Sequence, residues 1–246
     1  MRIGTLLQAC LGLAVVVTPQ ISFSAQDAGQ PLTYSAPVPH AERNRMRLQR
    51  QADRIELRDD DGGTLLATQP FAATSEVVIN GSDGDDTLIV DFTNGSPIPS
   101  GGLTFNGGDQ ATSRGDVLDI EGHSFGNVLY DSFNAHDGTI TLDGAAIRYT
   151  GLEPIVNSGT VADMVLTLPV GTVGASLEDD GTPGNNMVQL RSTNGTFETI
   201  VFTVPTNSLT VNAGGGTDTI TAAADFSTDF NVGLTINGSP ATDTVT

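Results

Sequence analysis

The chain has no lysine and no tryptophan, it has one cysteine, and aromatic residues make up 5% of its 246 residues. The cysteine, Cys10, lies in an apolar N-terminal stretch, so the rest of the chain can form neither a disulfide nor a cysteine metal site. After residue 25 no apolar period of 3.6 is sustained, which argues against long amphipathic helices. These absences favour an all-β protein that is stabilised by packing and backbone hydrogen bonds.

Positive charge is also scarce. Beyond residue 54 the chain has four arginines and 26 acidic residues, so the net charge of that part is near −22. A strongly negative surface repels the phosphate backbone, which excludes nucleic acid as a partner. The same charge favours divalent cations as partners.

Residues 1–25 have the composition of a secretory signal peptide. Arg2 precedes an apolar stretch from Leu6 to Val17, and small residues follow at Ser22–Ala25. The stretch is too short and too weakly flanked for a stable membrane span. We therefore expect a protein without a transmembrane span that is secreted or held at the cell surface.

Residues 26–54 are predicted to form a linker or an N-terminal cap. The segment contains three prolines and then five arginines within twelve residues. One interpretation is a docking peptide for an anionic partner. The other is a solvated segment that covers the first β repeat and keeps its edge from pairing.

The most informative feature is an internal duplication, because residues 55–107 recur in weaker form at residues 188–238. The matching segments are 55–58 with 188–191, 77–80 with 209–212, 84–88 with 216–220, and 103–107 with 234–238. Such self-similarity is typical of repeat architectures, in which a surface usually carries the function. We expect a first β module at 55–187 and a second, truncated copy at 188–246.

A shorter period lies inside the copies. Asn80 and Asn106, like Asn212 and Asn237, each end a short β-branched run and stand about 25 residues apart, and the interval from Asn106 to Asn212 is close to four further steps. Strands closed by Asn-Gly turns at this spacing predict a right-handed parallel β-helix, or β-solenoid, with the asparagines stacked at one corner. A tandem β-sandwich is the alternative.

Two turns carry the clearest chemical pattern. Residues 81–88 and 213–220 each resemble the hemolysin-type repeat G-G-x-G-x-D-x-U, and each lacks one of its glycines, at Ser82 and at Ala213. In that family, turn carbonyls and the aspartate bind calcium, so the resemblance implies ligand roles for Asp86 and Asp218. The neighbouring acidic residues of the first turn complete the set of expected calcium ligands: Asp83, Asp85, Asp86 and Asp218.

More broadly, the chain is similar in style to secreted bacterial repeat proteins with adhesin-like surface roles. That resemblance implies a structural, adhesive or cation-binding role at the cell surface, with surface polysaccharide or other copies of the protein as partners. Because the sequence stops inside a repeat, we expect unpaired strand groups near residues 234–245 that favour end-to-end association.

The alternative function is a carbohydrate-active β-helix enzyme, a polysaccharide hydrolase or lyase. Paired carboxylates can hydrolyse glycosides. The acidic and histidine residues that could serve lie in the part that is not duplicated: Asp116, Asp119, Glu121, His123, Asp131, His136 and Asp137. The absence of lysine and the few aromatic residues argue against this alternative.

Overall fold

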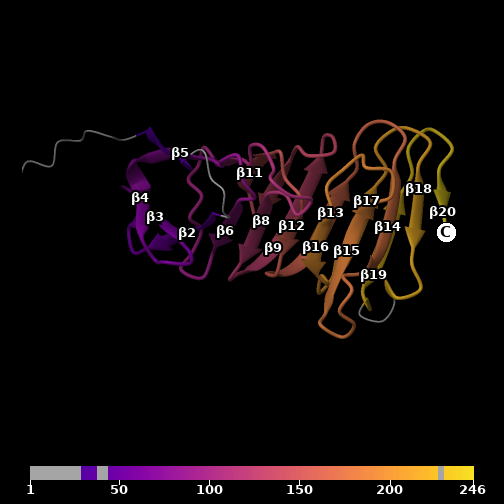
Figure 1. Ribbon diagram of the computed structural model, residues 1–246. Helices are drawn as coiled ribbons and strands as arrows, with labels where there is room; N and C mark the ends of the chain where they lie inside the picture. The colour runs from indigo at the N-terminus through magenta and orange to yellow at the C-terminus, as the bar shows by residue number, and fades with distance from the viewer. Residues whose placement is uncertain (1–28, 38–43, 227–229) are drawn as a thin grey trace, which may run out of the picture.

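The computed structural model describes residues 29–37, 44–226 and 230–246. Within these ranges the secondary structure consists of strands and one short 3-10 turn, η1 (Phe71–Ala73). The strands form two large mixed sheets, here called sheet A and sheet B, so the protein is all-β. Figure 1 shows one elongated stack that runs from β4 at the N-terminal end to β20 at the C-terminal end. No helix in the described ranges is long and apolar enough to cross a membrane.

Sheet A has nine strands in the order β1-β5-β7-β11-β10-β9-β13-β17-β19. All neighbours in this sheet are parallel except β10, which is antiparallel to both β9 and β11. The bounds are β1 (Gln30–Ser35), β5 (Thr74–Asn80), β7 (Leu103–Asn106), β9 (Ser124–Ser132), β10 (Gly138–Leu142), β11 (Ala145–Thr150), β13 (Thr160–Thr167), β17 (Ser208–Asn212) and β19 (Gly233–Asn237).

Sheet B has eleven strands in the order β20-β18-β14-β15-β16-β12-β8-β6-β2-β3-β4. Here β3 and β15 are the strands that run antiparallel to both neighbours. The bounds are β2 (Arg45–Gln51), β3 (Arg54–Asp59), β4 (Leu65–Pro70), β6 (Thr87–Asp91), β8 (Val117–Glu121), β12 (Ile155–Asn157), β14 (Gly174–Asp179), β15 (Met187–Ser192), β16 (Ile200–Thr203), β18 (Thr219–Ala222) and β20 (Thr244–Val245).

One apolar core lies between the sheets and extends from Leu32 to Phe226. Strands point alternate side chains to opposite faces, so the apolar residues of each strand reach the core while the residues between them face outward. Ile79 and Phe105 are 0% exposed and lie opposite each other on parallel β5 and β7. The period-two pattern of the sequence is therefore the pattern of the core.

The predicted pairing of the asparagines on adjacent parallel strands is confirmed. Asn80 lies beside Asn106 on β5 and β7, and Asn212 lies beside Asn237 on β17 and β19. The Asn106 side-chain amide donates to Asn80 Oδ1 at 2.7 Å, and Asn237 donates to Asn212 Oδ1 at 2.8 Å. Each pair thus forms a hydrogen bond between the last residues of two neighbouring strands of sheet A.

The prediction that the short interval continues from Asn106 to Asn212 is wrong. The next corner residue after Asn106 is Thr150, 44 residues on, which donates to Asn106 at 3.0 Å. The corner residue before Asn212 is Thr167, 45 residues back. The additional residues form three-stranded antiparallel meanders, β9-β10-β11 and β14-β15-β16, in which the chain doubles back within a sheet before it continues.

The duplication reappears strand by strand, because β1 to β8 have the same order and pairing as β13 to β20. β1 pairs with β5 as β13 pairs with β17, and β2 pairs with β6 as β14 pairs with β18. The duplicated segment that begins at residue 55 or 188 is the middle strand of a meander in sheet B, β3 or β15. Strands β9 to β12 lie between the two halves in both sheets.

In the range 26–54, expected to be a linker or cap, the structure has β1 and β2, which are paired into the two sheets. Arg47 pairs with Asp60 at 2.7 Å, with Asp91 at 3.0 Å and with Glu121. These arginine contacts balance carboxylates on the outer face of sheet B, the face opposite the core. The predicted signal peptide, residues 1–25, lies outside the described residues.

Candidate functional site

The first predicted ligand, Asp86, lies in the turn between β5 and β6 and is 0% exposed. Its carboxylate accepts a hydrogen bond from the Asn44 side-chain amide at 2.6 Å and another from the Ser82 backbone N–H. Buried carboxylates are stabilised when protein donors satisfy them in this way. Both oxygens of Asp86 therefore already have partners in the protein.

The other two acidic residues of this turn have different surroundings. Asp85 accepts from the N–H groups of Ala111 and Thr112 at 3.0 and 2.9 Å, and Asp83 is exposed. Among the described residues, no three acidic groups of this turn bring ligand atoms within 4.8 Å of one another. The carboxylates of Asp85 and Asp86 thus bind different backbone segments and do not converge on one point.

Asp218, the predicted ligand of the second turn, is also 0% exposed. Its Oδ1 accepts the Val173 N–H at 2.8 Å, whereas its Oδ2 is buried without a hydrogen-bond partner in the described part of the chain. The two predicted calcium turns lie apart in the stack, since the strands that follow them, β6 and β18, are separated in sheet B by β8, β12, β16, β15 and β14.

Two further aspartates continue this arrangement: Asp116, which the sequence suggested only as a catalytic carboxylate, and Asp243, which the sequence analysis did not single out. Asp116 Oδ1 accepts the Asp86 N–H at 2.6 Å, and Asp243 Oδ1 accepts the Asp218 N–H at 3.0 Å. Each of the four aspartates directly precedes a strand of sheet B, namely β6, β8, β18 or β20. The signal was present in the sequence: the Asn-Gly or Asn-Ala pairs at 80–81, 106–107, 212–213 and 237–238 are each followed, five to nine residues on, by Asp, then Thr or Val, then an apolar residue.

Asp116 differs from Asp86 because its Oδ2 is buried without a partner in the described residues. Burial raises the pKa of Asp116 to about 7; the Asp86 N–H opposes this shift, and the carboxylate of Asp86 adds to it. Asp116 is therefore a largely protonated carboxyl group below neutral pH.

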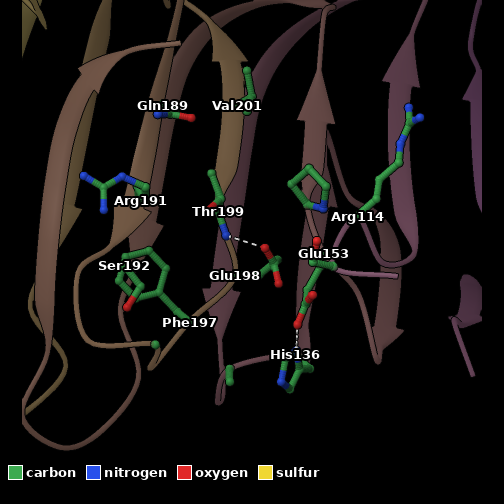
Figure 2. Close-up of a pocket in the computed structure, with 14 residues that line it drawn as sticks. Arg114, His136, Glu153, Gln189, Arg191, Ser192, Phe197, Glu198, Thr199 and Val201 are labelled. Carbon is green, nitrogen blue, oxygen red and sulfur yellow. Dashed lines mark hydrogen bonds and ion pairs between the residues drawn. The ribbon is translucent and has the colours of Figure 1, made fainter. Parts of the chain in front are cut away.

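A cleft of about 640 Å³ opens on the outer face of sheet B (Figure 2). The outward residues Gln189 and Arg191 of β15 and Val201 of β16 line it, together with loops at the starts of neighbouring strands. The corresponding inward residues, such as Leu190, belong to the core. The cleft thus lies on a rigid sheet.

Three titratable side chains meet in this cleft: His136, Glu153 and Glu198. Each stands two residues before a strand, β10, β12 or β16. One ligand atom of each lies within 4.8 Å of the ligand atoms of the other two, and His136 Nδ1 is 3.1 Å from Glu153 Oε1. Figure 2 shows the three residues on separate loops that come together at one end of the cleft.

Local hydrogen bonds hold the loops in place. The Asn134 side chain accepts from the N–H groups of His136 and Asp137 at 2.9 and 3.1 Å, which fixes the loop before β10. The Glu153 N–H donates to the carbonyl of Asp116 at 2.6 Å. Asn and Asp side chains commonly stabilise turns in this way, so the sequence specifies these loops locally.

Glu198 is the buried member of the group, with 7% exposure. Burial raises its pKa to about 8; the Thr199 N–H, which donates to Oε1 at 2.7 Å, opposes the shift, and the charge of Glu153 adds to it. A carboxyl group in such a place either holds a proton or pairs with a cation. A titratable group in a cleft whose pKa is strongly shifted is a candidate for a functional site.

Of the residues proposed for an enzyme, only His136 reaches this group. Asp119 and Glu121 lie on the outer face of β8, and His123 packs against the rings of Phe92 and Phe125. Asp131 belongs to sheet A. The two glutamates of the cleft are distant from His136 in sequence, and no local motif marked them.

Comparisons with known proteins give no family. No family model matches the sequence, and searches among curated proteins and solved structures find no similar protein.

Proposed function

We propose that the protein is a secreted, acidic β-solenoid with a structural or adhesive role at the cell surface. The observation that carries this proposal is the strand-by-strand doubling of β1–β8 in β13–β20. In a solenoid each repeat contacts only its neighbours, and the outer surface carries the function. The meanders are insertions that widen a coil without changing the direction of its first and last strands.

The chemistry of the turns supports this role. The predicted ligands Asp86 and Asp218 accept backbone N–H groups, and their own N–H groups donate to the aspartates of the next coil. The asparagines at the other end of the coil bond in the same manner. Polar turn residues that tie coil to coil serve a rigid scaffold and leave the acidic outer faces for contact with partners.

Export is the first part of the proposal that can be tested. The full chain and a variant that lacks residues 1–25 should be produced in a bacterial host, and intact cells should be treated with protease. We expect the full chain to be exported and accessible and the shortened chain to remain inside. Equal retention of both proteins in the cytoplasm would contradict a secreted role.

The adhesive part needs a binding measurement. Purified protein should be applied to immobilised acidic and neutral surface polysaccharides, with and without calcium. We expect retention that depends on the divalent cation, since the coil region has a net charge near −22 and repels acidic polymers by itself. Isothermal titration calorimetry of wild type and the double variant Asp85→Asn, Asp86→Asn measures calcium binding at the acidic turn, and equal calcium heats in both proteins would mean that the turn does not bind the ion.

A second candidate is a glycoside hydrolase, because Glu153 and Glu198 bring carboxylate oxygens within 4.8 Å of each other in the cleft. Retaining glycosidases hold their two carboxyl groups about 5 Å apart. If the cleft is hydrolytic, Glu198→Gln should abolish the release of reducing sugar from a susceptible polysaccharide. Release that is unchanged in this variant would remove the candidate.

A further inference from the structure

We propose that His136, Glu153 and Glu198 form a binding site for a divalent transition-metal cation, with zinc as the best match. This inference goes beyond the structural role, and it differs from the calcium interpretation of the turns. It rests on three residues that belong to three loops, and the fold brings their ligand atoms within 4.8 Å of one another.

The spacing fits a single small ion. Zinc binds histidine nitrogen and carboxylate oxygen at about 2.0 to 2.2 Å, so two ligands of one ion stand roughly 3 Å apart. His136 Nδ1 and Glu153 Oε1 are 3.1 Å apart. The third ligand, Glu198, belongs to the loop before β16 and lies beside Glu153 in Figure 2.

The donor set selects the class of metal. An imidazole nitrogen with two carboxylates suits zinc and related first-row ions, whereas calcium takes six to eight oxygen ligands. Three protein ligands leave one position of a tetrahedral ion for water or for a partner's group. Because the cleft is open to solvent, that position is accessible from outside.

The charge balance points the same way. Glu198 is 7% exposed, and its carboxyl receives one hydrogen bond, from Thr199, among the bonds of the described residues. Arg191, the nearby arginine of β15, is bound by Glu178 at 2.6 and 2.9 Å and does not pair with either glutamate of the cleft. A dication would neutralise the two carboxylates, which is the compensation that buried charge requires.

Zinc alone is the probe for the test, which uses isothermal titration of the purified protein without a histidine tag. Wild type should bind one zinc ion per chain. His136→Gln and Glu198→Gln should each weaken binding at least tenfold, about 1.4 kcal/mol. His123→Gln and Glu76→Gln are matched controls, since both residues are exposed and lie outside the group, and they should bind zinc as wild type does.

A second measurement replaces zinc by cobalt and records its visible spectrum. We expect the intense absorption of a four-coordinate site in wild type and in the two controls, and its loss in His136→Gln. His136 is exposed, so this variant should fold even if Glu198→Gln does not. Equal zinc binding by wild type and His136→Gln would overturn the site, and so would the absence of binding by wild type. Calcium that binds these residues as tightly as zinc would overturn the assignment of the metal class.

Discussion

The turn from Asn80 to Asp86 and the turn from Asn212 to Asp218 occupy the same place in the two halves of the molecule, yet their aspartates are not equally satisfied. Asp86 accepts the N–H of Ser82, four residues before it, and also an amide of Asn44. Asp218 has one donor, and its Oδ2 has no partner in the described residues. The same fold position therefore tolerates both a closed turn and an incomplete one.

The turns before Asp243 and Asp116 show which features allow the aspartate to accept a hydrogen bond from its own turn. Asp243 accepts the N–H of Ser239, also four residues before it, after an Asn-Gly-Ser start like that of the first turn. Asp116 follows Asn-Gly too, but its loop is four residues longer and its Oδ2 stays unpaired. The hydrogen bond from the N–H four residues earlier to the aspartate thus forms where the loop is short and where glycine follows the asparagine.

The glycine is needed because the carboxylate occupies the place of a side chain. A Cβ at Gly81 would lie 2.5 Å from Asp86 Oδ2, and a Cβ at Gly238 would lie 2.8 Å from Asp243 Oδ2. Ala213 carries this methyl group in the second half. Ala213, which replaces a glycine of the repeat pattern, therefore changes the hydrogen bonding of Asp218. In the sequence this replacement is visible only as one mismatch to the pattern.

The largest effect is expected for Gly81→Ala. Its Cβ would meet the Gly107 carbonyl oxygen at 1.9 Å, so the turn must shift, and the free energy of unfolding should fall by about 3 kcal/mol or more. Gly215→Ala is the matched control in the second turn, where the nearest atom is Val170 Cγ1 at 3.8 Å. Urea denaturation should show little loss, or a gain below about 1 kcal/mol, for the control. Similar stability of the two variants would mean that the first turn is not tightly closed.

The unpaired aspartate predicts a pH dependence. Burial raises the pKa of Asp116 to about 7 in the folded protein, well above the ordinary value of an aspartate, so the folded state holds a proton that the unfolded state releases. Stability from this group is fully present below about pH 4 and is lost as the pH rises to about 7, by a few kcal/mol. Urea denaturation at a series of pH values should show this fall and a flatter profile for Asp116→Asn. Glu198, whose pKa is about 8, continues the fall in both proteins. Parallel profiles would contradict the protonated state of Asp116.

Much of the fold follows from local sequence. Alternating apolar residues closed by Asn-Gly or Asn-Ala predicted four strands of sheet A, β5, β7, β17 and β19, and the pairing of Asn80 with Asn106, because the pattern repeats within about 25 residues. The meanders could not be predicted in the same way. Strands β10 and β15 turn back beside their neighbours in the same sheet, and a strand that turns back has the same alternation of apolar residues as one that passes to the other sheet.

The cleft was predictable only in part. His136 stood in a segment rich in acidic residues, but Glu153 and Glu198 follow it by 17 and 62 residues and have no recurring motif around them. Their meeting depends on parallel pairing of β12 with β16, a contact between residues about 45 apart in sequence. For the turns the reverse holds: the aspartates were visible, whereas their inward hydrogen bonds required coordinates.

Substitution of Asp86 and of Asp218 by alanine should lower the free energy of unfolding by different amounts. Asp86→Ala leaves the Ser82 N–H without its acceptor and removes the shorter of two bonds from the Asn44 amide, which also donates to Ser82 Oγ at 3.2 Å, so we expect a loss of about 2 to 3 kcal/mol. Asp218→Ala removes one accepted bond and also an oxygen that has no partner among the described residues, so the loss should be about 1 kcal/mol. Thermal and urea unfolding of both variants measure the difference. A larger loss for Asp218→Ala would mean that its free oxygen binds a group, such as an ion, that stabilises the second half.

The smallest effect is expected at the stacked asparagines, where Asn106 and Asn212 each make two side-chain hydrogen bonds of different length. Asn106 donates to Asn80 at 2.7 Å and accepts from Thr150 at 3.0 Å, whereas Asn212 accepts from Asn237 at 2.8 Å and reaches Thr167 only at 3.5 Å. Asn106→Ala should therefore cost about 1.5 kcal/mol and Asn212→Ala about 0.5 kcal/mol, since a partly exposed hydrogen bond contributes roughly 1 kcal/mol or less. Asn94→Ala, in a turn outside the corner, should leave the unfolding midpoint unchanged. Equal losses for Asn106→Ala and Asn94→Ala would show that the stacked amides add nothing to the strand pairing, and the stability of the corner would then come from the backbone alone.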